Sequence, residues 1–141
     1  MKIKIMSRYD AIRYCYAPHT ESSAIISIST PGIVYSNKPF INNTNEVKHI
    51  LRLYFTDDDV EPYCMQESEA IEICTFLETY KNVDILIVHC DAGVSRSAAI
   101  AAAIMKTQTG DDSSVFDNPL HSPNMHCYRL MLNQLYNSEE Q

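Results

Sequence analysis

Apolar and polar residues follow patterns along the chain that predict β-strands separated by helices. Charged and apolar residues alternate from Lys2 to Met6, as in a strand at the edge of a sheet. The β-forming segment Ala24 to Ser29 ends at a proline-glycine turn. A third strand is expected within Val47 to Phe55. The unbroken apolar run in Asp84 to His89 predicts a parallel strand covered on both faces.

Helical periodicity fills the intervals between these strands. A short helix is expected over Arg8 to Tyr16. After the third strand, Ser68 can cap a helix and Asn82 can end it. The apolar positions of that helix share one face: Ala70, Ile73, Cys74, Leu77 and Tyr80.

Two more helices follow the last predicted strand. An alanine-rich helix begins at Ser95 or Arg96 and runs to about Thr109, where Gly110 stops it. Pro123-Asn124 opens the final helix, and residues 42–45 and 111–122 are expected to be loops. Strands therefore alternate with helices, which predicts an α/β fold with a central, mainly parallel sheet flanked by helices. A chain of 141 residues is expected to form one domain, residues 1–141.

Composition narrows the range of partners. The net charge is −7 at pH 7, and binding to nucleic acid or to an anionic membrane needs excess lysine and arginine, so neither is expected as a partner. The apolar run at the start is too short for a signal peptide, and no apolar stretch is long enough to cross a bilayer. The five cysteines are irregularly spaced, which suits free thiols in a reducing compartment. We therefore expect a cytoplasmic monomer.

The segment that carries chemistry follows the most apolar strand. Cys90 ends that strand, and Arg96 begins the alanine-rich helix after a short loop that contains Gly93. Gly93 suits a tight turn that points backbone N–H groups inward. In open α/β sheets ligands bind between a strand end and a helix N-terminus, where free N–H groups and the helix dipole favour an anion. The pattern therefore predicts an oxyanion site next to a sulfur nucleophile.

The run His89-Cys90-x-x-Gly93-x-Ser95-Arg96-Ser97 resembles the signature HCxxGxxR[ST] of the cysteine-dependent protein tyrosine phosphatases. The short chain is most similar to their compact dual-specificity branch, and Pro123-Asn124 is similar to small bacterial and viral members. The resemblance covers Leu51 to about Thr109, and before that it rests on the order of strands and helices. It implies the phosphatase fold, with the active loop between a central strand and a helix N-terminus. It also implies phosphoric monoester hydrolysis without metal or cofactor.

The roles of the loop residues follow from this resemblance and from their chemistry. Cys90 is expected to be the nucleophile that forms a phosphocysteine, and Arg96 to bind the phosphoryl oxygens through its planar fork. Ser97 is expected to assist the thiolate, although it could simply bond local backbone, and His89 to order the loop. The Asp91 carboxylate is expected to face outward, where it tunes specificity or is solvated. The phosphate cradle would be formed by the backbone amides of Asp91, Ala92, Gly93, Val94, Ser95 and Arg96.

A general acid is also needed to protonate the leaving group. Asp57, Asp58 and Asp59 follow a strand that should run beside the Cys90 strand, so they should lie at the same sheet edge. The family places its acid on a loop at this point of the chain. We favour Asp57, with Asp58 close behind and Asp59 third.

Several alternatives stay open. The substrate would be a phosphorylated protein, with phosphotyrosine favoured, or a small aryl phosphate; phosphoserine and phosphothreonine remain candidates. Cys64 or Cys74 could form a protective disulfide with Cys90, although Cys74 fits a packing role better. The histidines and cysteines lack metal-ligand spacing, so no metal is expected. The first rival function is a pseudophosphatase, a binding module that recognises phosphate without turning it over. The second, less favoured, is a rhodanese-like sulfurtransferase.

Overall fold

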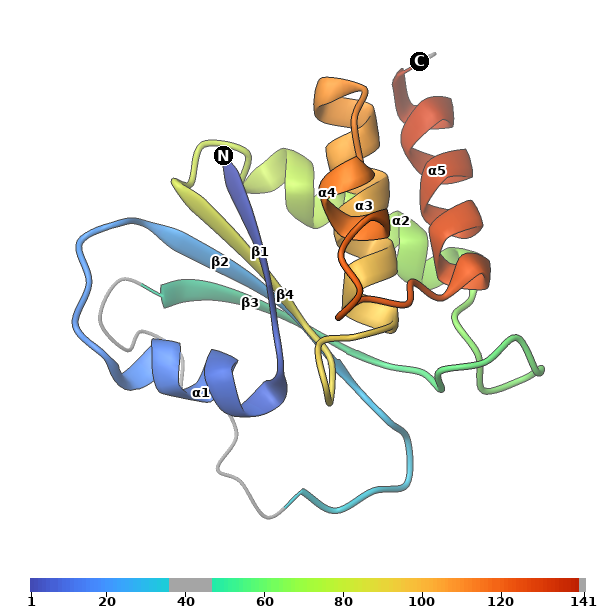
Figure 1. The fold of residues 1–141 in the computed structure, drawn as a ribbon, viewed down its shortest axis with the longest axis horizontal. Helices are drawn as coiled ribbons and strands as arrows, with labels where there is room; N and C mark the ends of the chain where they lie inside the picture. Colours follow the sequence, from blue (N-terminus) through green and yellow to red (C-terminus); the bar gives the residue numbers. More distant parts are fainter. Residues whose placement is uncertain (36–46, 140–141) are drawn as a thin grey trace.

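Four parallel strands form the centre of the molecule, in the order β1-β4-β2-β3 (Figure 1). They are β1 (Lys2–Met6), β2 (Ser23–Ser29), β3 (Val47–Tyr54) and β4 (Ile85–His89). The computed structural model describes residues 1–35 and 47–139. The predicted α/β class with a central parallel sheet is confirmed, and β1 is an edge strand as its alternating sequence predicts. The loop predicted for residues 42–45 lies outside the described residues.

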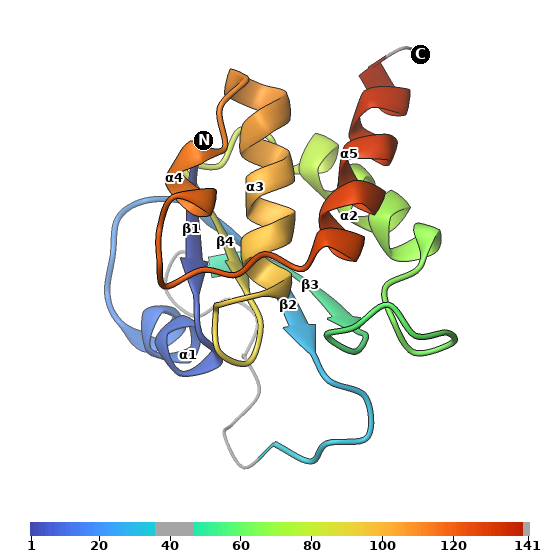
Figure 2. The same cartoon turned by 45° about the vertical axis from the view of Figure 1, so that its right-hand side comes forward.

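Helices cover both faces of this sheet. They are α1 (Arg8–Tyr16), α2 (Glu67–Thr79), α3 (Arg96–Thr109), the single turn α4 (Ser113–Phe116) and α5 (Met125–Glu139). Figures 1 and 2 show α1 on one face, and α2, α3 and α5 together on the other. No helix in residues 1–35 or 47–139 is long and apolar enough to cross a membrane.

The central strands explain why β4 reads as an unbroken apolar run. Ile85 and Ile87 point toward α1, where they pack with Ala11 and Cys15. The alternate residues Leu86 and Val88 belong to the larger core under α2, α3 and α5. Because side chains of a strand alternate between faces, a strand covered on both sides needs apolar residues at every position. This burial fixes the position of the loop that follows β4.

Local details differ from the sequence predictions at helix ends. The helix α2 is capped by Gln66 rather than Ser68, because the Glu69 carboxylate accepts a hydrogen bond from the Gln66 N–H at 3.0 Å. Ser68 instead donates to the other oxygen of Glu69. The helix ends at Thr79, before Asn82. The turn α4 lies in a segment predicted as loop; it forms because Val115 is buried against α3, a tertiary contact without periodicity in the sequence.

Candidate active site

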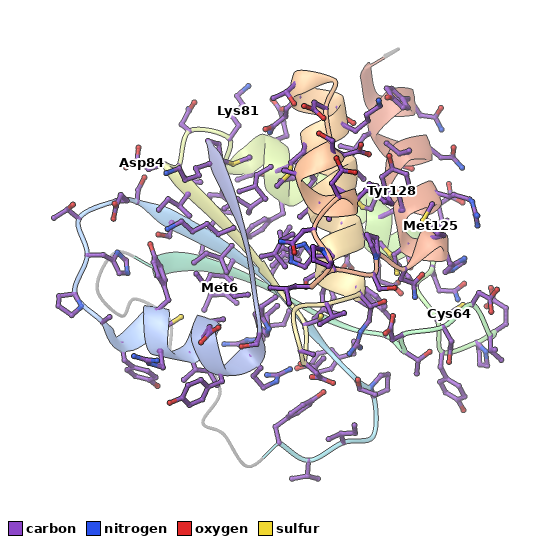
Figure 3. The ribbon with its side chains drawn as sticks, viewed as in Figure 1. Met6, Cys64, Lys81, Asp84, Met125 and Tyr128 are labelled. Carbon is purple, nitrogen blue, oxygen red and sulfur yellow. The ribbon has the colours of Figure 1, made fainter. Side chains whose placement is uncertain are left out.

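The loop from Cys90 to Ser95 connects the buried strand β4 to the N-terminus of α3. Gly93 gives the loop its bend: its φ is +73°, a conformation that favours glycine. It also lies against the end of β1, so that a Cβ at this position would stand 2.7 Å from the carbonyl carbon of Met6 and 2.8 Å from the nitrogen of Ser7. Figure 3 labels Met6 at the end of β1. The loop can therefore approach the β1–α1 junction only because residue 93 has no side chain.

Cys90 is held in an environment that favours its thiolate. Its Sγ lies 3.1 Å from the hydroxyl oxygen of Ser97. Desolvation by burial raises the pKa of the Cys90 thiol, but hydrogen bonds from Ser97 and the Gly93 backbone, with the Arg96 charge, lower it more, so the net pKa is lowered. The residue is only 3% exposed, so the sulfur lies at the base of the loop rather than at its rim.

The other four cysteines have the opposite electrostatic setting. Burial raises the pKa of Cys15 to about 11 and that of Cys127 to about 12. Desolvation also raises the pKa of Cys64 and of Cys74. None of the five cysteines, all of which lie in the described residues, forms a disulfide. Cys90 is therefore the cysteine of this chain whose surroundings suit nucleophilic attack.

Arg96, the first residue of α3, is held at two of its nitrogens. Its Nη1 donates to the carbonyl oxygen of Phe55 at 2.7 Å, and its Nη2 donates to the carboxylate of Asp91 at 3.1 Å. The Nε–H is buried and has no hydrogen-bond partner among residues 1–35 and 47–139. A buried donor left unpaired is unfavourable unless a ligand satisfies it. The guanidinium therefore has a donor available to an oxyanion bound in the loop.

Asp57 is brought to the loop by the tertiary structure. One oxygen, Oδ1, accepts a hydrogen bond from the Ser95 hydroxyl at 2.7 Å and another from the Asn124 amide at 2.9 Å. Both bonds end on the same oxygen, which directs an acidic proton to Oδ2. A carboxyl group so placed can donate a proton to a leaving group bound over the loop.

Asp58 and Asp59 do not share this position. The Asp58 carboxylate accepts hydrogen bonds from the Thr56 hydroxyl at 2.8 Å and from the Val60 N–H at 3.1 Å, so it stabilises its own turn. Asp59 is exposed. Of the three successive aspartates, Asp57 is the one that the structure bonds to the loop.

Asn124 is a site residue whose role sequence reasoning missed. Its side-chain oxygen accepts from the Cys127 N–H at 3.0 Å, which caps α5, while its amide nitrogen reaches Asp57. Its backbone N–H donates to the carbonyl of Ser95 at 3.1 Å. The sequence marks Asn124 as a helix start, but the contacts to Asp57 and Ser95 depend on how α5 packs.

His89 lies directly before the nucleophile and is completely buried. One ring nitrogen is hydrogen-bonded to the Cys90 carbonyl at 3.1 Å and the other to the Ser27 hydroxyl at 2.7 Å. Desolvation by burial lowers the pKa of His89 to about 4, so the ring is neutral near pH 7. These contacts tie the start of the loop to β2, which suits an ordering role rather than proton transfer.

The prediction that the Asp91 carboxylate faces outward is wrong. Its Oδ2 accepts from the hydroxyl of Thr30 at 2.9 Å as well as from Arg96, and its Oδ1 lies 3.5 Å from Arg8 Nη2. The physical reason is that two arginines from separate helices flank this position and attract the carboxylate. The sequence contains both arginines but gives no sign that they meet.

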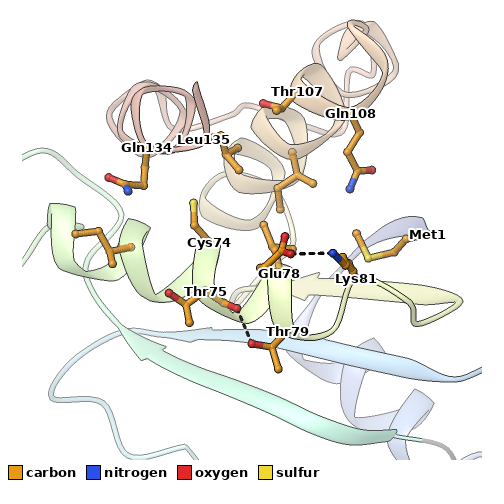
Figure 4. Close-up of a pocket in the computed structure, with 13 residues that line it drawn as sticks. Met1, Cys74, Thr75, Glu78, Thr79, Lys81, Thr107, Gln108, Gln134 and Leu135 are labelled. Carbon is orange, nitrogen blue, oxygen red and sulfur yellow. Dashed lines mark hydrogen bonds and ion pairs between the residues drawn. The ribbon is translucent and has the colours of Figure 1, made fainter. Parts of the chain in front are cut away.

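A hollow of 390 Å³ adjoins the loop, between Ser95 and the first turn of α5, where Arg129 forms part of its wall. A larger hollow of 600 Å³ lies between α2, α3 and α5 and is lined by residues such as Cys74, Leu77 and Leu135 (Figure 4). None of the residues predicted to act in catalysis or phosphate binding lines the larger hollow. Within the described part of the chain, no cluster of three histidine, cysteine or carboxylate side chains could hold a metal ion.

Comparisons with known proteins define the fold. No protein-family model matches the sequence, and no curated protein matches it either. The structure is similar to that of human DUSP28, with a TM-score of 0.56, 16% identity, and coverage of 99% of this chain and 94% of that chain. It is also similar to PTPMT1 in complex with PI(5)P, with a TM-score of 0.54, 15% identity, and coverage of 84% and 80%.

A third similar structure is the human tyrosine phosphatase-like serine/threonine/tyrosine-interacting protein, with a TM-score of 0.53, 22% identity, and coverage of 85% of this chain and 78% of that chain. Identities at this level bear on the fold alone. The predicted bacterial or viral branch stays a prediction. The chain has the α/β fold of dual-specificity-phosphatase-like proteins, with the predicted loop between the central strand β4 and the N-terminus of α3.

Proposed function

We propose that this protein is a phosphoric monoester hydrolase of the protein tyrosine phosphatase type, with Cys90 as its nucleophile. One observation carries the proposal: a thiol with a lowered pKa lies at one end of a loop, and at the other end is an arginine whose buried Nε–H has no hydrogen-bond partner among the described residues. A thiolate supplies the nucleophile, and the free guanidinium donor supplies charge for a phosphoryl oxygen. The fold, with the loop at a helix N-terminus, is consistent with this chemistry.

In the first step, the Cys90 thiolate attacks phosphorus. An S–P bond forms, the P–O bond to the leaving group breaks, and the leaving oxygen takes a proton from Asp57. Arg96 and the loop amides bind the equatorial oxygens, on which charge spreads in the transition state. The Ser95 and Asn124 bonds to Asp57 hold its carboxyl group over the loop.

In the second step, water attacks the phosphocysteine. The S–P bond breaks, inorganic phosphate forms, and the Asp57 carboxylate takes the proton from the water. The departing sulfur becomes a thiolate again, and the Ser97 hydroxyl, 3.1 Å away, stabilises it. The cycle needs neither an oxidant nor a reductant, and its only co-reactant is water.

The depth of the sulfur favours an aryl phosphate as substrate. Because Cys90 is only 3% exposed, a phosphoryl group must enter on an arm that reaches the base of the loop. A phosphotyrosine side chain provides a longer and flatter arm than phosphoserine or phosphothreonine. We therefore propose a phosphotyrosyl protein or a small aryl phosphate as substrate.

The test is hydrolysis of p-nitrophenyl phosphate by the reduced protein, because this leaving group barely needs an acid. The wild type and a Cys74→Ser control are expected to turn over, whereas Cys90→Ser is expected to be inactive and still bind orthovanadate. Inactivity of the reduced wild type would overturn the catalytic proposal. Orthovanadate binding without any turnover would instead favour the phosphate-reading binding module.

A further inference from the structure

The carboxylate of Asp91 connects three segments that are distant in sequence. Its Oδ2 accepts from Thr30, which follows β2, and from Arg96, which begins α3. Its Oδ1 forms an ion pair with Arg8, which begins α1, and its backbone carbonyl accepts from the Arg8 N–H at 3.2 Å. One loop side chain thus joins the ends of two strand–helix units.

The partners of Asp91 are themselves held in place. The Arg8 guanidinium donates to the hydroxyl of Ser29 and lies 3.8 Å from the centre of the Tyr35 ring, over its face. The Tyr35 hydroxyl accepts from the Thr30 N–H at 2.7 Å. The carboxylate therefore does not move freely at a loop tip, because each of its neighbours has a second anchor.

These contacts have a direct consequence for the guanidinium of Arg96. Its side chain is 6% exposed, and its two terminal nitrogens are bonded to the Phe55 carbonyl and to Asp91. A guanidinium has five N–H donors in a rigid plane, so two bonds at different nitrogens fix the orientation of that plane. The Nε–H is then presented without a hydrogen-bond partner in the part of the chain that the structure describes. Loss of the Asp91 bond would leave the group held at Nη1 alone.

Asp91 places a negative charge in the loop that is proposed to bind phosphate, and this charge needs an explanation. Desolvation by burial raises the pKa of this carboxyl, but hydrogen bonds from Thr30 and Tyr35 and the Arg96 charge lower it more, so it is anionic at neutral pH. An anion in a loop that binds phosphate repels the substrate. Retaining it there is understandable if the carboxylate orients a group that the substrate needs.

We propose that Asp91 is a positioning residue that holds the Arg96 guanidinium at Nη2 and so presents its Nε–H to a phosphoryl oxygen, while Thr30 and Arg8 hold Asp91. This inference rests on the proposed function, because it assigns the held guanidinium to the phosphoryl group. It goes beyond that function in connecting α1 and the Thr30 segment to the reacting centre.

Two substitutions separate orientation from charge. Asp91→Asn can keep an acceptor oxygen toward Thr30 and Arg96 but removes the negative charge that forms ion pairs with Arg8 and Arg96. Asp91→Ala removes every side-chain contact. Asp117→Asn is the matched control, because it removes one negative charge at an exposed position in a turn after α4.

With p-nitrophenyl phosphate, Asp91→Ala is expected to lower kcat about 100-fold, the size of effect that a small misplacement of a catalytic group produces. Asp91→Asn is expected to keep kcat within a few-fold of the control and to bind orthovanadate more tightly than the wild type, because one repelling charge is gone. If Asp91→Ala matches the control, or if Asp91→Asn is as slow as Asp91→Ala, the positioning role is refuted.

A second measurement tests the inference when the protein is inactive or when a variant does not fold. The ¹⁵N–¹H NMR signal of the Arg96 Nε–H reports a fixed guanidinium without any turnover, and the wild-type signal alone tests the inference if Asp91→Ala does not fold. We expect a sharp, slowly exchanging signal in the wild type and in Asp91→Asn, and a broadened one in Asp91→Ala. A broad signal already in the wild type would refute this inference even if the protein is an active phosphatase. Conversely, a sharp signal in an inactive wild type would refute only the proposed function.

Discussion

The bend at Gly93 gives the sharpest test of how this loop is built. Gly93→Ala introduces a Cβ that would stand 2.7 Å from the Met6 carbonyl carbon and 2.8 Å from the Ser7 nitrogen. These atoms are backbone and cannot rotate away as a side chain could. Either the loop or the β1–α1 junction must move.

The expected loss of stability has two parts. A residue with a Cβ at φ +73° loses about 1–2 kcal/mol relative to glycine. Forcing an extra methyl group into a packed position adds about 1–3 kcal/mol. The matched control is Gly110→Ala, because Gly110 has a similar φ of +79° but nothing within 4 Å of its Cβ position. The control should therefore lose only the first part.

The assays are urea unfolding and hydrolysis of p-nitrophenyl phosphate. Gly93→Ala is expected to lose about 2–5 kcal/mol of unfolding free energy and about 100-fold in kcat/KM, because the amides proposed to bind phosphate move with the loop. Gly110→Ala is expected to lose about 1–2 kcal/mol and to keep full activity. Equal destabilisation of the two variants, with activity retained in both, would refute the role assigned to the close approach at Met6.

Three further predictions follow from the site. Asp57→Asn should slow phosphotyrosine hydrolysis about 100-fold or more but slow p-nitrophenyl phosphate hydrolysis far less, whereas the control Asp58→Asn should have near-normal rates. Equal losses of rate on both substrates, or a larger selective loss in Asp58→Asn, would contradict the choice of acid. Ser97→Ala removes a group that lowers the pKa of Cys90, so the acidic limb of the plot of kcat/KM against pH should move to higher pH. The phosphocysteine should also break down more slowly. An unshifted pH profile would argue against this contact. Burial lowers the pKa of His89 from 6.5 to about 4, so below pH 6.5 the unfolded chain binds a proton that the folded protein does not. The free energy of unfolding should therefore fall by about 3 kcal/mol between pH 6.5 and pH 4. Urea unfolding of His89→Gln should depend less on pH than that of the wild type, and an identical pH dependence would refute the assignment.

Much of the fold could be predicted from the sequence because local patterns reflect burial. The apolar run of β4 and the alternating pattern of β1 each correspond to a distinct place in the sheet, centre and edge. Helix ends were less predictable, because Ser68 and Gln66 are both near the start of α2 and only the side chain of Glu69 selects between them. Competing local hydrogen bonds of similar strength leave no signal in a residue pattern.

The choice among the three aspartates shows where sequence reasoning stops. Their order along the chain places all of them near the end of β3, but a difference of one residue turns the carboxylate in another direction. The Asp58 carboxylate accepts a hydrogen bond within its own turn. The Asp57 carboxylate instead accepts hydrogen bonds from Ser95 in the loop and from Asn124 at the start of α5. The sequence favours Asp57, and the contacts that distinguish it arise only when distant segments pack.

By itself, the sequence determined the order of strands and helices, the loop from Cys90 to Arg96 and the residue types available for phosphoryl chemistry. These features depend on neighbours along the chain: apolar periodicity, a glycine in a turn and a helix start. Only the tertiary structure decided that Asp91 faces inward between Arg8 and Arg96 and that the Arg96 Nε–H finds no hydrogen-bond partner within residues 1–35 and 47–139. Charge–charge contacts of this kind join segments whose separation along the chain carries no information about their distance in space.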